Sequence, residues 1–364
     1  MEKGETMKSN CRLRDAGLSV GELPTGRFNG ITDVRNVRVG HVTLRKAEGE
    51  PSAACTGVTA ILPHEGNWFR QKVPAATHVI NGFGKTTGLI QVDELGVLES
   101  PILLTNTFSV PAVTEGTVRY MTALDSGIGD DAGSLNVVVG ECNDSYLNDM
   151  RGFHIRPEHA RAAIEEAQNH RRIQEGCVGA GTGMICFGWK GGIGTASRRV
   201  KVKETPYHIG VLVLSNFGVS SDFTLLGTPV GRWLHPNVHR TDVDGSIMIV
   251  VATDLPMNNR QLKRLAKRAS FGLARTGSIA HHGSGDIVIA FSNAHRISHT
   301  PEAVTEVPYL AEDGPLISRS FRGVVEATEE AILNSLFTAE ITRGRLGRTI
   351  PSLPVEEAIA LLKR

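Results

Sequence analysis

The sequence lacks the cysteine patterns that mark disulfide-rich proteins and thiolate metal sites. It has five cysteines, an odd number, and no two of them form a C-x-x-C pair. Small disulfide scaffolds and thiolate zinc sites depend on such pairing and spacing. We therefore predict neither of them, and a reducing compartment fits the composition best. The five are Cys11, Cys55, Cys142, Cys177 and Cys186.

Long apolar runs are also missing. The first residues, MEKGETMKSNCRLRD, carry charges but no apolar stretch of the kind that a signal peptide needs. No window approaches the run of about eighteen apolar residues that predicts a membrane-spanning helix. We therefore expect a cytoplasmic protein without a membrane partner.

Neither sign of charge is in excess. Thirty-nine basic residues face thirty-eight acidic ones, which gives a formal charge of +1. A near-neutral chain produces no overall field that attracts nucleic acid or an anionic surface. The basic residues of segment 258–275 are not interleaved with aromatic ones, so they indicate a solvated helix face rather than a nucleic-acid site.

Common catalytic motifs are absent as well. The sequence has no H-E-x-x-H and no G-x-x-x-x-G-K-[ST]. His281, His282 and Asp286 come nearest to a metal-ligand cluster, but adjacent strand residues point to opposite faces. We therefore predict no metal. The glycine-rich stretches GAGTGM and GGIGTA are predicted to be structural turns.

What the sequence does contain is a series of short apolar runs that alternate with helical patterns. Several runs are apolar on both faces, which indicates sheets that are covered on both sides. This alternation predicts an α/β fold in one unit. The predicted strands are 56–63, 100–107, 135–141, 184–189, 208–216, 246–253 and 286–292, and the predicted helices are 111–124, 157–168, 258–275, 325–339 and 355–362.

Four polar residues lie at the ends of these predicted strands. Ser246 opens the strand in DGSIMIVVATDLP, and Asn216 closes the strand in HIGVLVLSN. Ser284 and Asp286 are two residues apart, so they can share one face of a strand. Each alone is typical of a turn or a cap. Together they are candidates for a hydrolytic site.

Over nearly the whole chain, the segments resemble those of one known family in their residues and in their order. They include RLRDAGL, NGITDV, SAACTGVTAILPH, LLTNT, YLNDMRGF, QEGCVGAGTGMICFGWKGGIGTASR, GSIMIVVATDLP, QLKRLAKRAS and GSGDIVIAFS. These segments are similar to those of the self-processing L-aminopeptidase D-amidase/esterases and β-peptidyl aminopeptidases. The resemblance implies an aminopeptidase or amidase that needs no cofactor and acts on short peptides, amino-acid amides or esters of L-, D- or β-amino acids.

The same resemblance implies the fold and the maturation of the chain. The expected fold is a four-layer αββα sandwich, similar to N-terminal-nucleophile hydrolases with different connectivity and shared with ornithine acetyltransferases. A single domain, 1–364, would be cut between Gly245 and Ser246 into chains 1–245 and 246–364. A homo-oligomer, a tetramer of such heterodimers, is expected.

Roles for individual residues follow from the resemblance. Ser246 matches the nucleophile, Asn216 the side-chain donor to the oxyanion, and Ser284 with Asp286 the pair that orients the nucleophile or relays protons to it. An acid is also expected to hold the ammonium group of the substrate. Glu141 matches that position, and Asp130 remains an alternative.

This sequence departs from the family pattern at two places. Relatives carry a tyrosine near LND that supports the reacting carbonyl, and here either Asn143 or Tyr146 is the candidate. An acid is expected where Lys85 stands in NGFGKTTG, so the charge near the pocket is reversed.

An acyltransferase of the ornithine acetyltransferase type remains the alternative function. Those enzymes carry threonine at the position of Ser246, so the serine favours hydrolysis.

Overall fold

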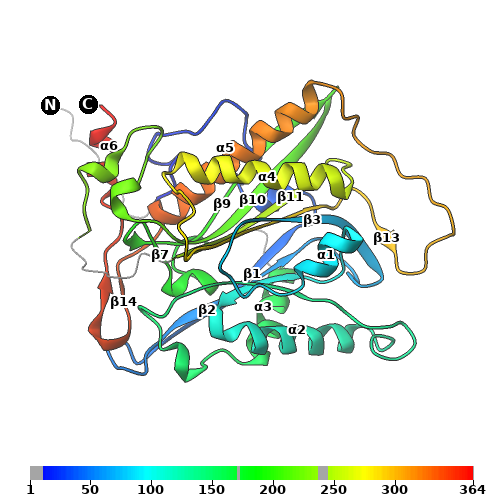
Figure 1. Cartoon of the computed structure of the whole chain (residues 1–364), viewed down its shortest axis with the longest axis horizontal. Coiled ribbons are helices and arrows are strands. Elements are labelled where there is room, and N and C mark those ends of the chain that lie inside the picture. The colour runs from blue at the N-terminus through cyan, green and yellow to red at the C-terminus, as the bar shows by residue number, and fades with distance from the viewer. Residues whose placement is uncertain (1–10, 170–172, 237–244, 364) are drawn as a thin grey trace.

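Two β-sheets lie face to face between two layers of helices, as Figure 1 shows. The computed structural model describes residues 11–169, 173–236 and 245–363. An apolar cluster between the sheets takes side chains from both of them, including Leu104 and Val138 from one and Leu214 and Met248 from the other. The αββα sandwich expected from the sequence is therefore the observed fold.

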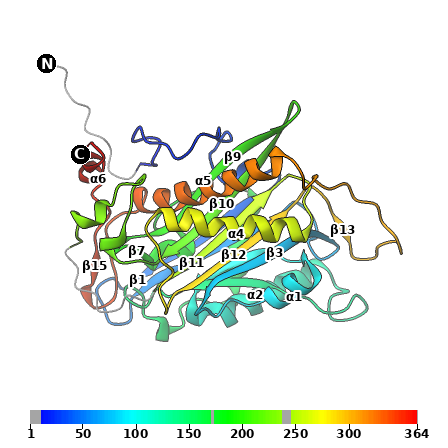
Figure 2. The same ribbon diagram turned by 45° about the horizontal axis from the view of Figure 1, so that its top comes forward.

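The larger sheet has the strand order β13-β3-β12-β11-β10-β9, and β4 pairs with β3. β11 and β12 run parallel, whereas the other neighbours are antiparallel. Figure 2 shows its long strands side by side beneath α4 and α5. The bounds are β3 Gln71–Gly82, β4 Val97–Leu98, β9 Gly192–Val202, β10 Thr205–Asn216, β11 Ser246–Thr253, β12 Gly285–Ser292 and β13 Ile297–Ser298.

The smaller sheet has four strands in the order β1-β2-β5-β6. Only β5 and β6 run parallel in it. Two short hairpins, β7–β8 and β14–β15, lie outside both sheets. The bounds are β1 Arg38–Lys46, β2 Ala54–Leu62, β5 Ile102–Asn106, β6 Val138–Cys142, β7 Ile185–Cys186, β8 Trp189–Lys190, β14 Thr342–Arg343 and β15 Thr349–Ile350.

Helices cover the outer face of each sheet. α5 contacts β9 and β10, and α4 contacts β3 and β12, while α2 and α3 cover the smaller sheet. Among the described residues, no helix is long and apolar enough to cross a membrane. The bounds are α1 Leu89–Leu95, α2 Val110–Leu124, α3 Pro157–Asn169, α4 Asn259–Arg275, α5 Pro315–Phe337 and α6 Val355–Leu361.

β11 shows why the larger sheet is buried on both faces. Ile247, Ile249 and Val251 belong to the apolar cluster under the helices, whereas Met248 and Val250 belong to the cluster between the sheets. Successive strand residues point to opposite faces, so an unbroken apolar run fills both clusters. The prediction of sheets covered on both sides is confirmed.

Each predicted strand and helix has a counterpart, but one strand is broken and one helix is longer. Segment 184–189 forms the hairpin β7–β8, because Phe187 and Gly188 both take positive φ, 51° and 84°. Such a pair of residues makes a two-residue hairpin turn. α5 begins at Pro315 rather than at Val325. Asn258 caps α4 and accepts a hydrogen bond from the Gln261 N–H.

The sequence did not predict β1, β3, β9 or α1. β9 begins GIGTAS, which has too few large apolar residues to be recognised as a strand. The structure gives the reason at Gly194, where a Cβ would lie 2.0 Å from the carbonyl oxygen of Ala331 in α5. β9 therefore needs small residues because the backbone of α5 lies directly on it.

A buried cluster of charges joins the N-terminal segment, β9 and α5. The guanidinium of Arg198 is fully buried and donates to Glu326 Oε2 at 2.9 Å and to Glu330 Oε2 at 2.7 Å. Arg14 pairs with Glu330 at 2.7 Å. The N–H of Glu22 donates to Glu326 Oε1 at 3.1 Å. Buried charges that are fully paired in this way tolerate the loss of a partner poorly.

We predict that Arg198→Met lowers the free energy of unfolding by roughly 3–5 kcal/mol, because it leaves two buried carboxylates without their shared cation. Urea unfolding followed by circular dichroism measures the change. Arg322→Met is the control, since its pair with Glu22 is mostly exposed and should contribute less than about 1 kcal/mol. Equal losses in both variants would contradict the prediction.

Candidate active site

Strand register places two of the candidate residues in one row with Gly285. Asn216 of β10 lies opposite Ser246 of β11, and Ser246 lies opposite Gly285 of β12. Ser284 and Asp286 flank Gly285 in the chain. The sheet therefore brings together at one end four residues that the sequence predicted from separate segments.

The hydroxyl of Ser246 and the carbonyl of Gly245 share one donor. The Gly285 N–H lies 3.2 Å from Ser246 Oγ and 3.2 Å from the carbonyl oxygen of Gly245. Ser246 is only 5% exposed. The Gly245–Ser246 peptide bond is thus held with its carbonyl and the adjacent hydroxyl at the same backbone amide.

Gly245 has no room for a side chain. A Cβ there would lie 2.3 Å from the Asn216 carbonyl oxygen and 2.5 Å from Phe217 Cα. Both are backbone atoms, which cannot move aside as the end of a flexible side chain could. The glycine in DGSIMIVV is therefore required by the close approach of β10. Asp244, which precedes it, lies outside the described residues.

The side chain of Asn216 is held at both ends. Its Oδ1 accepts a hydrogen bond from the Ile185 N–H at 2.8 Å, and its Nδ2 donates to the carbonyl oxygen of Asn143 at 2.9 Å. An amide nitrogen carries two N–H groups, and this bond uses one of them. The orientation of the amide beside Ser246 is therefore fixed without occupying all its donors.

Ser284 and Asp286 form a buried pair. Ser284 Oγ donates to Asp286 Oδ1 at 2.5 Å, so the expectation that both side chains share one face is met. Burial raises the pKa of Asp286 to about 6, although the Ser284 hydroxyl beside it lowers the pKa. A carboxyl group with a pKa near neutrality is suited to exchange protons at working pH.

Glu141 approaches the same place from the smaller sheet. It is 3% exposed at the end of β6. Its Oε1 accepts a hydrogen bond from the Lys85 N–H at 2.8 Å, and its Oε2 accepts one from the Thr107 hydroxyl. These two donors fix the carboxylate group between the sheets.

A small cavity of about 90 Å³ connects some of these groups, but Asn216, Ser284 and Asp286 are not in its lining. Glu141 and Ser246 both line it, so a carboxylate and a hydroxyl face the same space. The full lining is Phe83, Lys85, Thr107, Glu141, Asn143, Gly245, Ser246 and Gly283.

The sequence left two choices open, and in each the structure places one of the two residues at the cavity. Glu141 lines the cavity, whereas Asp130 lies in an exposed turn after α2. Asn143 also lines the cavity. Tyr146 packs beside an apolar cluster that includes Cys55 and lies under the guanidinium of Arg348, 4.8 Å from the ring centroid.

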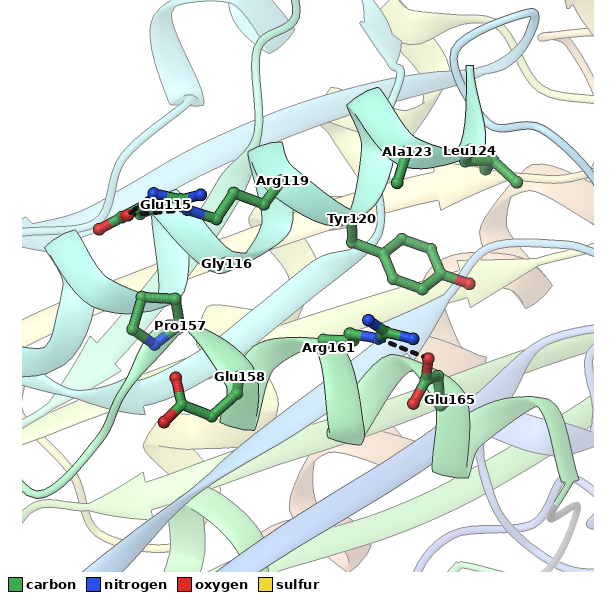
Figure 3. A pocket seen from close by; sticks show the side chains of 10 residues that line it. All are labelled: Glu115, Gly116, Arg119, Tyr120, Ala123, Leu124, Pro157, Glu158, Arg161 and Glu165. Atoms are coloured by element: carbon green, nitrogen blue, oxygen red, sulfur yellow. Dashed lines mark hydrogen bonds and ion pairs between the residues drawn. The ribbon is translucent and has the colours of Figure 1, made fainter. Parts of the chain in front are cut away.

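A larger groove lies elsewhere, between α2 and α3 on the outer side of the smaller sheet (Figure 3). Its volume is about 660 Å³. Four of its charged side chains pair along their own helices, Arg119 with Glu115 and Arg161 with Glu165. No serine, threonine, cysteine or histidine lines it, so the chemistry points to the smaller cavity.

The sequence analysis assigned no role to several residues that the structure places at the site. Gly285 is one of them, although its segment GSGD was recognised as part of the family resemblance. A Cβ there would lie 2.9 Å from the Phe83 carbonyl oxygen, so the glycine lets β12 approach the loop after β3. Thr107 is another, although LLTNT was recognised too. Nothing in the sequence indicates that the Thr107 hydroxyl contacts Glu141.

Asp144 is the most deeply buried of the missed residues. It follows Asn143 directly and is fully buried, and its Oδ1 accepts a hydrogen bond from Asn148 Nδ2 at 3.0 Å. Burial raises its pKa to about 7, against the lowering effect of Thr56 and Asn148. Its place in the polar stretch ECNDSYLND gave no sign of burial.

A comparison with known families shows which family the chain belongs to. The sequence model described as peptidase family S58 matches residues 29–350. The chain belongs to peptidase family S58. The resemblance stated from the sequence is thus confirmed, and with it the expectation that the protein is a peptidase.

Curated relatives and solved structures of family S58 cover nearly the whole chain. The β-peptidyl aminopeptidase BapA of Sphingosinicella microcystinivorans is 40% identical over 99% of this chain and 94% of its own length. The PH0078 protein of Pyrococcus horikoshii OT3 is 47% identical with a TM-score of 0.93, covering 97% of this chain and 99% of that one.

A third relative carries a description of its fold. The L-aminopeptidase D-Ala-esterase/amidase of Ochrobactrum anthropi is 36% identical with a TM-score of 0.90, covering 97% of this chain and 98% of that one. It is described as a prototype for the serine aminopeptidases and a new variant of the Ntn hydrolase fold. The predicted fold class and its similarity to N-terminal-nucleophile hydrolases are therefore confirmed.

We predict that Asp144→Asn flattens the pH dependence of stability between about pH 4 and 7. The folded state raises the pKa of this carboxyl, so in that range the unfolded chain loses the proton first. Stability then falls as pH rises, by up to about 1.4 kcal/mol per pH unit, and asparagine cannot titrate.

Urea unfolding across this pH range measures the slope. Asp131→Asn, in an exposed turn, is the control and should keep the wild-type slope. The prediction is wrong if Asp144→Asn keeps it too.

Proposed function

We propose that the chain is an aminopeptidase that activates itself by cutting its own Gly245–Ser246 bond. Ser246 then acts as an N-terminal nucleophile and releases the first residue from short peptides, amides or esters. The observation that carries the proposal is the shared donor at Gly285, because it holds the bond to be cut beside the hydroxyl that would cut it.

The cut needs only groups that already lie together. Ser246 Oγ attacks the Gly245 carbonyl carbon, and the Gly285 N–H stabilises the charge that develops on the carbonyl oxygen. The C–N bond breaks as the amide becomes an ester, and the nitrogen takes up the proton lost by the hydroxyl. Water then cleaves the ester, leaving a carboxylate on Gly245 and a free α-amine on Ser246.

The new α-amine supplies the general base for peptide hydrolysis. An α-amino group has an ordinary pKa of about 7.7–8.0, so part of it is unprotonated near neutral pH. It can take the proton from Ser246 Oγ as that atom attacks a substrate carbonyl. Asn216 Nδ2 is the candidate donor to the oxyanion, a contribution of roughly 2.7–4 kcal/mol when one such donor is removed.

Ser284 and Asp286 assist this step as a proton relay or as an orienting pair. Their hydrogen bond and the raised pKa of Asp286 support either role. Both residues adjoin Gly285, whose N–H contacts Ser246 Oγ.

Glu141 selects substrates with a free amino group. Its carboxylate lines the cavity that Ser246 opens onto, and a substrate ammonium would give it an ionic partner. The names of two relatives, a β-peptidyl aminopeptidase and an L-aminopeptidase D-Ala-esterase/amidase, support the same substrate class: L-, D- or β-amino acids at the N-terminus. A tetramer of heterodimers and a cytoplasmic location stay predictions.

We predict that purified wild-type protein shows two chains, the smaller beginning at Ser246, and that Ser246→Ala stays one chain without peptidase activity. Denaturing electrophoresis with N-terminal mass spectrometry measures the cut. Ser221→Ala, an exposed serine, should be processed normally. An intact wild-type chain with full activity would refute self-cleavage.

We also predict that N-acetylation of a short peptide amide lowers kcat/KM strongly. Acetylation removes the ammonium and leaves Glu141 unpaired, a loss of about 2–5 kcal/mol for a buried charge pair. Glu141→Gln should lose most of this discrimination, whereas Asp130→Asn should keep it. If discrimination survives Glu141→Gln and disappears in Asp130→Asn, the ammonium is held by Asp130 instead.

A further inference from the structure

Among the residues that the structure describes, Lys85 is the only basic one in the lining of the cavity. Its backbone N–H is fixed by the hydrogen bond to Glu141 Oε1 at 2.8 Å. Its side chain is exposed at the mouth of the cavity. Lys85 therefore holds the Glu141 carboxylate with its backbone N–H and carries its own ammonium at the open end of the cavity.

The partner of the Lys85 ammonium is an aromatic ring. In the part of the chain that the structure describes, no Asp or Glu oxygen forms an ion pair with it. Its Nζ lies instead over the ring of Phe83, 4.7 Å from the centroid. A cation over an aromatic face is held by the ring without losing its charge. Lys85 is thus positioned at the mouth and available to an anion.

Glu141 and Lys85 give the cavity opposite charges at its two ends. Glu141 is 3% exposed and lies between the sheets, whereas Lys85 is exposed. Complementary charges at fixed positions select a partner more than they add affinity. The ligand that matches this arrangement is a short zwitterion with an ammonium at the inner end and a carboxylate at the outer end.

We propose that Lys85 binds a substrate carboxylate, so that the site prefers short zwitterionic peptides over uncharged amides of the same length. The inference rests on the proposed aminopeptidase function, because it takes Glu141 as the contact of the substrate ammonium and Ser246 as the attacking group.

Two sources could supply the carboxylate: the free C-terminus of a short peptide or an acidic side chain on the first residue. The cavity of about 90 Å³ leaves little space for a large first side chain, and Lys85 lies on the open side. The structure therefore favours the C-terminal carboxylate of a dipeptide or tripeptide.

The test compares matched substrate pairs on the processed enzyme. One pair is L-Ala-L-Ala and L-Ala-L-Ala-amide, which differ only in the C-terminal carboxylate. The other pair is the p-nitroanilides of L-Glu and L-Gln, which differ in the first side chain. Release of the first residue gives kcat/KM for each, and the readout is the ratio within a pair.

We expect wild-type enzyme to favour L-Ala-L-Ala over its amide by about twofold to fivefold, the range of an exposed ion pair. The preference should fall with added salt, since such charges are screened within about 10 Å at 0.1 M ionic strength. It should arise in KM, because the carboxylate lies away from the reacting bond.

Lys85→Met should abolish the preference, Lys85→Glu should reverse it and Lys85→Arg should keep it. Lys201→Glu is the control with the same change of net charge as Lys85→Glu. It lies at the tip of the β9–β10 hairpin, at the opposite end of β10 from Asn216, and should keep the ratio.

A preference confined to the L-Glu pair and lost in Lys85→Met would support carboxylate binding and move its source to the first side chain. Equal ratios near one in wild type and all variants, with normal release from neutral substrates, would overturn the inference and leave the proposed function standing. No release from any substrate would overturn both.

Discussion

The register of β10, β11 and β12 is the constraint on which the candidate site depends. A shift by one residue would turn every side chain of β11 to the other face, exchanging Ile247 with Met248 between two apolar clusters. The burial of β11 on both faces therefore fixes where Ser246 lies. The packing of β11 away from the site therefore sets the distances between Ser246 and the residues beside it on β10 and β12.

The site also depends on the gap between the two sheets. Ser246 and Asn216 come from the larger sheet, whereas Glu141 comes from β6 of the smaller one. Strand pairing within the larger sheet aligns Asn216 with Ser246. Only the packing of one sheet on the other brings Glu141 close to Ser246. The proposed nucleophile and the proposed substrate contact therefore come from separate layers.

Sequence reasoning found the residues that end or begin an apolar strand, because a polar residue at such a point is conspicuous. Ser246, Asn216, Ser284 and Asp286 all belong to this class. It could not choose between Glu141 and Asp130, because that choice depends on how the two sheets pack. Asp144 was missed for a related reason: its burial comes from the fold of a loop and has no periodic pattern.

The same limits apply to the fold. The strands with continuous apolar runs were predicted, whereas β9 was not, since the contact with α5 demands small residues there. The break at Phe187 and Gly188 is a backbone property that side-chain hydrophobicity does not record.

The strand order of the larger sheet bears on whether folding or the proposed cleavage after Gly245 comes first. Strands β11 and β12 come from the segment after Gly245, and they lie between β3 on one side and β10 with β9 on the other, all from the segment before it. Neither segment contains the complete larger sheet or the complete apolar cluster between the sheets. The groups of the proposed self-cleavage therefore meet only in a folded chain. The proposed activation would then act as a check on folding, because a misfolded copy would keep its bond intact and would never gain a reactive amine.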